Sequence, residues 1–512
     1  DINPGTKERP LKTPQAAKKR AGELLKTSEK GVEVLFREGE YRFAESLKFT
    51  AADSGKDDSP VVYKAYNGEK VEFKGSVQID SSKGQYITDE KVLSRLYDSV
   101  RTKVVCFDLK NFGFTSSMVR QPAVEDGPHA LRNGEVNGVY INGETQTVAE
   151  WPNGEGIYRR WEDAVNATTI KYTDTQPDRW TTAKDFWIGG YPSYDYYYIR
   201  QSVTGLDSDE KTISIYSSIP MHQFTSHQSR RWKAINLLEE IDVPGEYYID
   251  TDNLLLYIYP TSSLKDAKME ISWLSEPLIS VQNAKNIRFE GIDFSQTRGN
   301  GVTMVNVDNV DFADCRFDEI LSHAIYVYGT AKAQTDKEYW QVQDIDASYN
   351  CDVTGCIFNN IGGGAIHMSG GNVDTLKKSN NVISDNMIYH ANYLAKNQCA
   401  VLLKGCGTTV VHNNISKCPF MAIRHYGNDH TISYNEIYNV DQESDDCGAI
   451  YAGRNVLQRG TEISYNYLHD LFTTEKLPFG FQSAIYWDDA QTGLSAHHNI
   501  IKNARIDLAS NG

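Results

Sequence analysis

Short hydrophobic segments of one pattern recur along the second half of the chain. Each has alanine, then isoleucine or valine, then a residue that differs between copies. The copies are His323-Ala324-Ile325-Tyr326, Gly364-Ala365-Ile366-His367, Cys399-Ala400-Val401-Leu402, Met421-Ala422-Ile423-Arg424, Gly448-Ala449-Ile450-Tyr451 and Ser483-Ala484-Ile485-Tyr486. The closest copies lie about 22 residues apart, and longer segments separate the others. A repeat of this length predicts a solenoid in which each copy belongs to one coil.

A second series of residues runs in step with the first. Each member is an asparagine two residues before isoleucine or leucine: Asn386, Asn413, Asn435, Asn466 and Asn499. Asparagine tolerates the left-handed backbone conformation, and its amide can bond to the same residue in the next coil. We therefore expect a ladder of stacked asparagines at one turn of every coil.

The segments between these markers are short, rich in β-branched residues and separated by frequent turns. No long stretch has the spacing of an amphipathic helix. This combination predicts an all-β chain folded as a parallel β-helix from about residue 275 to residue 512.

Alternation along a strand then sorts the side chains of the repeated segments. If the isoleucine or valine of each segment faces the core, the next residue and the residue two further on face outward. The outward set is Tyr326, Tyr328, His367, Ser369, Leu402, Lys404, Arg424, Tyr426, Tyr451, Gly453, Tyr486 and Asp488. Adjacent coils lie about 4.8 Å apart, so we expect these side chains to share one aromatic, cationic and carboxylic face.

The N-terminal region predicts a cap for the solenoid. Thr13 is a suitable helix N-cap and Pro14 a suitable first helical residue, so a short helix should extend to about Thr27. A helix covering the open end of a solenoid is its expected role. Alternating strands follow, and residues 1–130 are expected to hold the helix and the first strands or coils.

Residues 131–245 interrupt the repeats and predict an inserted β-sandwich-like module, after which residues 246–512 form the solenoid. The insert concentrates aromatic residues, namely Trp161, Trp180, Phe186, Trp187, Tyr191, Tyr194, Tyr196, Tyr197 and Tyr198. Two interpretations are open. The aromatic residues form either a surface on which sugars stack or the core of a small sandwich, since aromatic residues dominate core packing.

Charge and composition restrict the partners. The formal net charge of −16 gives no basic surface typical of nucleic-acid binding, and no apolar run reaches membrane-spanning length. The eight cysteines lack zinc-binding spacing, so most are expected to be buried thiols, and no metal or cofactor is predicted. Asp1 is compatible with a mature start after signal cleavage, which predicts a secreted, periplasmic or cell-surface protein. The last coil has no evident cap, so a second chain or domain is expected to cover it.

Several sequence segments resemble those of bacterial right-handed β-helix glycoside hydrolases, and most closely those of glycoside hydrolase family 141, which includes α-L-fucosidase and xylanase activities. These segments are Ala149-Glu150-Trp151-Pro152-Asn153, Asn236 to Tyr248, Gly427-Asn428-Asp429-His430, Asp446 to Arg454 and Tyr486-Trp487-Asp488-Asp489. The resemblance spans nearly the whole chain and implies a right-handed helix. Two positions depart from it: Cys447 stands where the family more often has alanine, and Trp487 where leucine is typical.

The resemblance implies that the catalytic carboxylates are Asp446 and either Asp488 or Asp489. Paired carboxylates beside aromatic and cationic groups suit glycosidic cleavage of a complex polysaccharide or oligosaccharide. The expected substrate-binding residues are His367, Lys404, Arg424, His425, Tyr426, Tyr451, Arg454, Tyr486 and Trp487. One difficulty is geometric, because a straight strand would separate Asp446 from Asp488 by more than about 20 Å. The pair can meet only if the loop from Asp441 to Cys447 folds back across the face.

Two other functions remain open from the residues. A polysaccharide lyase acting on uronates would use Lys404 or Arg424 as base and the acidic run of Asp441, Glu443, Asp445 and Asp446 to hold a cation. A non-catalytic carbohydrate-binding solenoid would bind glycans without turnover.

Overall fold

The computed structural model describes residues 3–28, 30–119, 136–216, 230–333, 342–471, 477 and 480–511. The chain divides into two compact units. The first comprises residues 1–75, 276–474 and 481–512, and the second comprises residues 76–275 with residues 475–480. The expected boundaries at 131 and 245 therefore differ from the observed ones. The reason is that strands on both sides of the expected insert pair with it.

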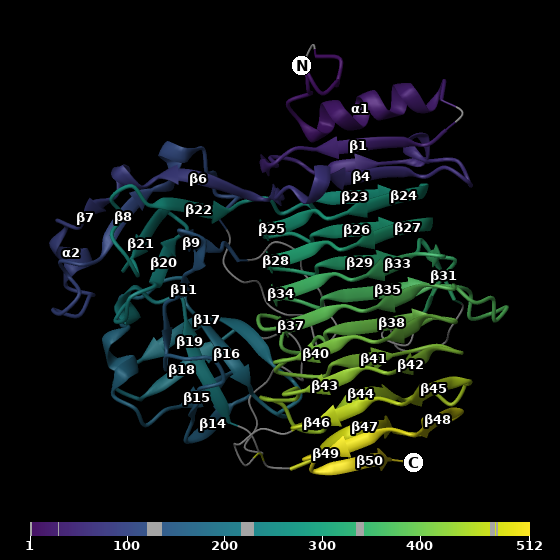
Figure 1. The fold of residues 1–512 in the computed structure, drawn as a ribbon. Helices are drawn as coiled ribbons and strands as arrows, with labels where there is room; N and C mark the ends of the chain where they lie inside the picture. Colours follow the sequence, from purple (N-terminus) through teal and green to yellow (C-terminus); the bar gives the residue numbers. More distant parts are fainter. Residues whose placement is uncertain are drawn as a thin grey trace. The chain divides into compact units, whose positions relative to one another are not determined.

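The first unit is a stack of coils, each contributing one strand to each of three parallel sheets (Figure 1). Sheet 1 comprises β1 (Val32–Phe36), β4 (Val61–Ala65), β24 (Lys285–Glu290), β27 (Val307–Ala313), β33 (Asp352–Thr354), β36 (Val382–Ser384), β39 (Thr409–Val411), β42 (Thr431–Ser433), β45 (Thr461–Ser464) and β48 (Leu494–His497), with β32 (Ser348–Tyr349) beside β27. Sheet 2 comprises β2 (Gly39–Arg42), β5 (Val71–Lys74), β25 (Asp293–Thr297), β28 (Arg316–Ile320), β34 (Ile357–Ile361), β37 (Met387–Ala391), β40 (Asn414–Ser416), β43 (Glu436–Tyr438), β46 (Tyr467–His469) and β49 (Ile500–Lys502).

Sheet 3 carries the repeated segments. It comprises β3 (Leu47–Phe49), β23 (Ile279–Gln282), β26 (Val302–Val305), β29 (Ile325–Tyr328), β35 (Ile366–Gly370), β38 (Val401–Gly405), β41 (Ile423–His425), β44 (Cys447–Gly453), β47 (Gln482–Asp488) and β50 (Ile506–Ser510). A small antiparallel pair, β30 (Ala331–Lys332) and β31 (Asp344–Ile345), projects beside it. The predicted parallel β-helix is thus confirmed, and it begins earlier than residue 275 because β1 to β5 form its first coils.

The predicted inward stack is also confirmed. Six side chains lie in direct register across sheet 3 and are almost fully buried: Ile325, Ile366, Val401, Ile423, Ile450 and Ile485. Burying a side chain of this kind stabilises the fold by about 1.5–3 kcal/mol relative to leaving it exposed. This continuous apolar column fixes the register, because a slip of one residue would turn every core side chain outward.

The asparagine ladder forms as expected, but the left-handed residue is the one before each asparagine. Asn413 donates its backbone N–H and its Nδ2 to Oδ1 of Asn435, at 3.0 and 2.9 Å, and the same double contact recurs from Asn386 to Asn499. The preceding residues, Asp385, His412, Tyr434, Tyr465 and His498, have φ between 55° and 58°. The turn is therefore made by the residue before each asparagine, and the backbone N–H of the asparagine is satisfied by the asparagine of the next coil.

Replacing Asn435 with alanine is expected to destabilise the first unit by about 1–3 kcal/mol. The variant leaves the backbone N–H of Asn413 buried without its acceptor, which carries a full desolvation cost. Nδ2 of Asn413 keeps the carbonyl oxygens of Ile383 and Val411 as acceptors. Denaturant unfolding measures the change. The matched control is Asn414→Ala, whose amide bonds to Glu436 at the surface and whose loss should cost under about 0.5 kcal/mol. Equal effects in both variants would contradict the ladder's role.

The helix α1 (Pro14–Leu25) lies across the N-terminal end of the stack (Figure 1). Its N-cap is Thr13, whose hydroxyl accepts from the N–H of Ala16 at 3.2 Å, as the sequence predicts. An ion pair of 2.8 Å joins Lys18 to Asp53, and the same ammonium lies 5.6 Å from the ring of Phe49. The helix is thus attached to the first coil as a cap.

The second unit consists of three mainly antiparallel sheets. The first sheet comprises β10 (Glu144–Thr145), β9 (Val139–Ile141), β22 (Lys268–Ser272) and β6 (Ser76–Asp80). The second comprises β11 (Thr147–Val148), β20 (Glu246–Asp250), β21 (Leu255–Ile258), β8 (Val105–Asp108) and β7 (Gln85–Tyr86). The third comprises β12 (Glu150–Trp151), β19 (Arg231–Ile235), β16 (Trp187–Tyr191), β17 (Ile199–Asp207), β18 (Thr212–Ile215), β15 (Thr169–Lys171) and β14 (Asp163–Asn166), with β13 (Arg159–Arg160) beside β19. The short helix α2 (Glu90–Leu93) precedes β8.

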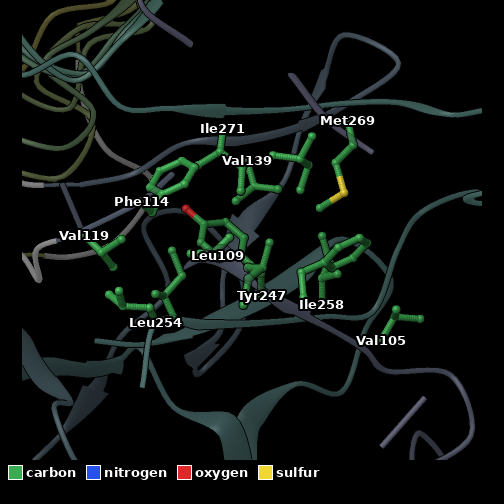
Figure 2. Packing of buried hydrophobic residues seen from close by; sticks show 14 of the residues in the cluster. Val105, Leu109, Phe114, Val119, Val139, Tyr247, Leu254, Ile258, Met269 and Ile271 are labelled. Atoms are coloured by element: carbon green, nitrogen blue, oxygen red, sulfur yellow. The ribbon is translucent and has the colours of Figure 1, made fainter. Parts of the chain in front are cut away.

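Two hydrophobic clusters show what holds this unit together. Aliphatic side chains from β8, β9, β21 and β22 pack with Phe114 and Tyr247, as Figure 2 shows. A separate aromatic cluster contains Trp161, Trp180, Phe186, Tyr197 and Trp232, all buried. The aromatic concentration in the sequence is therefore mainly core, and only Tyr194 and Tyr196, stacked at 5.2 Å, lie at its partly buried margin.

Three further predictions from the sequence concern membrane spans, the cysteines and the last coil. None of the helices in the described residues is long and apolar enough to cross a membrane. All eight cysteines are free thiols, and all except Cys106 are buried. On the last coil, Ile500 and Leu508 are exposed. A partner covering that coil stays a prediction.

Candidate active site

The outward face of sheet 3 brings the predicted residues into one continuous column. Tyr326, His367, Leu402, Arg424, Tyr451 and Tyr486 occupy successive strands from β29 to β47 in direct register. Asp488 lies in register with Gly453, on the same side as Tyr486 and two residues further along β47. These side chains therefore share one side of sheet 3, as alternation along the strands predicts.

A single tyrosine joins the two carboxylates. The hydroxyl oxygen of Tyr486 lies 3.1 Å from Oδ1 of Asp446 and 2.9 Å from Oδ1 of Asp488. The hydroxyl of Tyr451 donates to the other oxygen of Asp488 at 2.7 Å. Because both contacts share the Tyr486 oxygen, the two carboxylate oxygens are separated by no more than the sum of those distances, about 6.0 Å.

The geometric difficulty posed by a straight strand is thus removed. Asp446 stands immediately before β44 with φ of 53°, so the chain turns sharply there. The preceding residue holds this turn in place. Oδ1 of Asp445 accepts from the N–H groups of Asp446 and Phe481, at 3.0 and 2.6 Å. Asp446 is thereby directed toward the tyrosine in the middle of the neighbouring strand.

The surroundings of Asp446 and of the two tyrosines raise their pKa values. Burial raises the pKa of Asp446 above its ordinary value, and the nearby charge of Asp488 raises it further. Burial is also the main reason that the pKa values of Tyr451 and Tyr486 lie well above the usual tyrosine value. Both tyrosines therefore stay protonated and can act as hydrogen-bond donors.

Two arginines flank the pair. The guanidinium of Arg424 lies 5.0 Å from the ring of Tyr451 and 5.1 Å from that of Tyr426, within cation–π range of both. Nε of Arg454 lies 3.0 Å from Oδ2 of Asp489 and 4.0 Å from Oδ2 of Asp488. Asp489 is exposed and faces the arginine, so the structure brings Asp488 rather than Asp489 together with Asp446.

Two strand glycines make room for these side chains. A Cβ on Gly448 would lie 2.6 Å from Cβ of Tyr486. A Cβ on Gly453 would lie 2.7 Å from the Tyr451 hydroxyl and 2.9 Å from Cβ of Asp488. Sequence reasoning did not assign this role. The available signal was a glycine inside a strand, which marks a close approach of neighbouring atoms.

His367 and Lys404 lie further up the same face. His367 is buried against Tyr326, with ring centroids 4.5 Å apart, and burial lowers its pKa well below the usual histidine value. Lys404 donates to the carbonyl oxygen of Val342 at 3.4 Å. A carboxylate that the sequence did not suggest, Asp344, accepts from Ser369 at 3.0 Å and pairs with Lys332. These groups lie coils away from the carboxylate pair.

Two predicted substrate-binding residues do not share this face. His425 is completely buried, because it follows the outward Arg424 and so points into the coil, where its ring lies 6.3 Å from that of His430. Trp487 lies between the outward residues Tyr486 and Asp488 and is in register with the buried Ala452. Alternation along the strand therefore places both side chains on the side opposite this face. His425 is buried there, which corrects its assignment, whereas Trp487 is only half-buried and its role in substrate binding stays a prediction.

Two of the acidic residues before β44, Asp441 and Glu443, contact other protein side chains rather than forming a cation site. Asp441 is completely buried, and its carboxyl contacts the thiol of Cys447. Burial raises the pKa of Asp441 to about 7. Glu443 pairs with Lys396 at 2.6 Å. Among the described residues, no group of three or more His, Cys, Asp or Glu side chains is arranged to hold a metal ion.

Comparisons with known proteins agree with this architecture. A family model described as "Right handed beta helix region" matches residues 254–398. A solved structure titled "Glycoside hydrolase" is 17% identical with a TM-score of 0.70, over 98% of this chain and 94% of the other. The structure of XylC in complex with xylose is 12% identical with a TM-score of 0.52, over 98% and 84%. No curated protein matches the sequence. The chain has the all-β fold of a right-handed parallel β-helix.

Proposed function

We propose that this protein is a glycoside hydrolase in which Asp446 and Asp488 are the catalytic pair. The observation that carries the proposal is the hydroxyl of Tyr486, which contacts both carboxylates at 3.1 and 2.9 Å on the face of sheet 3. A pair of carboxyl groups flanking the scissile bond is the common requirement of glycosidic cleavage. The similarity of the fold to a structure titled as a glycoside hydrolase supports the same class.

The shared hydroxyl supports different roles for the two aspartates. A tyrosine hydroxyl carries one proton, so it donates to one carboxyl and must accept from the other. Asp446 is suited to carry the proton, because burial and the charge of Asp488 both raise its pKa. Asp446 is therefore the general acid. Asp488, which receives donors from Tyr451 and Tyr486 on its two oxygens, is the carboxylate.

The separation of the pair favours retention of configuration. An upper limit of about 6.0 Å between the nearest oxygens lies below the range of about 6.5–9.5 Å typical of inverting enzymes. In the first step an oxygen of Asp488 bonds to the anomeric carbon while Asp446 transfers its proton to the departing oxygen. In the second step Asp446 removes a proton from water, the water oxygen bonds to the anomeric carbon, and the bond to Asp488 breaks.

A screen of plant and host glycans with product analysis tests the function. Wild-type protein should release new reducing ends, and NMR should show the product anomer with the configuration of the substrate bond. The double variant Asp446→Asn/Asp488→Asn is the inactive control. Unsaturated products absorbing in the ultraviolet would instead establish a lyase. Glycan binding without turnover would establish a non-catalytic solenoid.

Replacing Gly453 with alanine is expected to lower turnover by on the order of 10²-fold, because small displacements of reacting groups have effects of this size. The new Cβ would displace the Tyr451 hydroxyl and Asp488, which lie 2.7 and 2.9 Å from its position. Initial rates on a confirmed substrate measure the loss. The control is Gly205→Ala in β17, where the new Cβ meets Ser214 at an ordinary 3.8 Å. Equal rates in both variants would show that the close approach is not needed.

A further inference from the structure

Cationic side chains gather on sheet 3 and on the neighbouring strand β30, upstream of the carboxylate pair. Lys404 and Lys332 both lie near Asp344, whose carboxylate pairs with Lys332 and accepts from Ser369. Lys404 itself donates to a carbonyl oxygen at 3.4 Å. One carboxylate therefore faces two ammonium groups. This local excess of positive charge occurs in a chain whose formal net charge is −16.

Arg424 extends the positive charge toward the reacting groups. Its guanidinium lies 5.1 Å from the ring centroid of Tyr426 and 5.0 Å from that of Tyr451, and Tyr451 donates to Asp488. Contact with two rings restricts the guanidinium, so less freedom is lost when it binds a ligand. A planar guanidinium matches the two oxygens of a carboxylate or sulfate.

The order of the strands relates these cations to the direction of a bound glycan. Lys404, Arg424, Tyr451 and Asp488 come from β38, β41, β44 and β47, which are consecutive in sheet 3 (Figure 1). Each step along the stack is about 4.8 Å. Arg424 is thus two coils and Lys404 three coils from the strand that carries Asp488. A glycan lying along the stack with its cleaved bond at Asp488 would extend over both.

We propose that this face binds an acidic glycan, whose sugar carboxylate or sulfate lies against Arg424 and Lys404 while the bond to be cleaved lies at Asp446 and Asp488. The inference rests on the proposed function only for the position of the cleaved bond. The lowered pKa of Lys404, caused first by burial and then by Lys332 and Arg424, agrees with cations held close together. A bound anion would relieve their repulsion.

The test measures ligand protection of Lys404 in the full chain carrying Asp446→Asn, which separates binding from turnover. Lysine methylation by formaldehyde and a hydride donor is followed by mass spectrometry at Lys404, with the exposed Lys502 of β49 as reference. The probes are glucuronate, galacturonate, and the 6-sulfates of glucose and galactose. Neutral glucose and galactose are the controls.

We expect acidic sugars to protect Lys404 but not Lys502, and neutral sugars to protect neither. Uronates protecting alone would identify the anion as a carboxylate, and sulfates protecting alone would identify it as a sulfate ester. Protection should weaken at high salt, since ions screen such contacts. Equal protection by neutral and acidic sugars, or none by any of them, would overturn the proposal.

A second measurement uses turnover. On an acidic glycan that the protein cleaves, Lys404→Gln is expected to raise KM by about tenfold or more with kcat nearly unchanged, as for loss of a charged hydrogen bond. The matched variant Lys502→Gln should leave KM unchanged. If Lys404 is protected by acidic sugars but no glycan is cleaved, the proposed hydrolysis fails while the acidic site stands. If instead the protein cleaves neutral glycans and Lys404→Gln leaves KM unchanged, the proposed hydrolysis stands while the acidic site fails.

Discussion

Replacing Asp446 or Asp488 with asparagine is expected to slow turnover by about 10²–10⁴-fold, the usual contribution of general acid–base catalysis. Asparagine keeps the size of the side chain but removes its charge and its transferable proton. Substrate binding should be largely retained, because the tyrosines and Arg424 remain in place. Steady-state rates and direct binding of the same substrate measure the two effects separately.

Two further variants sharpen this result. Asp489→Asn should lose much less activity, since Asp489 is exposed and pairs with Arg454 rather than with Tyr486. Asp374→Asn, on an exposed loop, should leave the rate unchanged. Wild-type rates in both Asp446→Asn and Asp488→Asn would reject the assignment. Azide added to Asp488→Ala should restore turnover and give a glycosyl azide of inverted configuration.

The pH dependence of kcat/KM tests the same assignment of Asp446 as the general acid. Asp446 must be protonated to act as the acid, so kcat/KM should fall as the pH rises through the pKa of Asp446. Burial and Asp488 raise that pKa, which extends activity to higher pH than an ordinary aspartate would allow. This alkaline decline should disappear in Asp446→Asn when a substrate with a good leaving group is used.

The stability of the first unit is expected to decrease by up to about 4 kcal/mol between pH 4 and pH 8 because of Asp441. Its pKa is about 7 in the folded protein and 3.8 when unperturbed, and each unit corresponds to about 1.4 kcal/mol. Well below pH 3.8 the carboxyl is protonated in both the folded and the unfolded state. As the pH rises toward 7, the unfolded chain releases this proton first, so folding loses stability.

Comparison of wild type with Asp441→Asn isolates this effect. The variant cannot ionise, so its advantage over wild type should grow between pH 4 and pH 7 and then become constant. Denaturant unfolding across this range provides the measurement, with Asp374→Asn as the exposed control. A difference between wild type and Asp441→Asn that does not change with pH would show that Asp441 does not titrate in this way.

The repeated segments and the asparagines were sufficient to predict the coil, its register and its outward face. Both patterns reflect contacts between successive coils, which recur at fixed positions and so leave a periodic signal. The same periodicity placed Tyr451, Tyr486 and Asp488 on one face. Alternation also indicated that His425 points inward, although its imidazole group had suggested a role in substrate binding.

The contact of Asp446 and Asp488 through the hydroxyl of Tyr486 could not be predicted in the same way. It depends on a turn with φ of 53° at Asp446, on Asp445 bonding to Phe481, and on the reach of one tyrosine. These contacts occur once and have no period. The limits of the second unit were also missed, because β6 pairs with β22 across a long stretch of sequence.

The insertion of the second unit has a consequence for the order of folding. Leu47 in β3 pairs with Ile279 in β23, so the first coil meets the rest of the stack only after about 230 intervening residues have been synthesised. Such a long closure is slow and entropically costly. Ser76 and Ser272 are paired strand residues near the two ends of the insert. Once the insert has folded, the effective loop shrinks to a few residues, so the N-terminal coil and its helix should dock last and quickly.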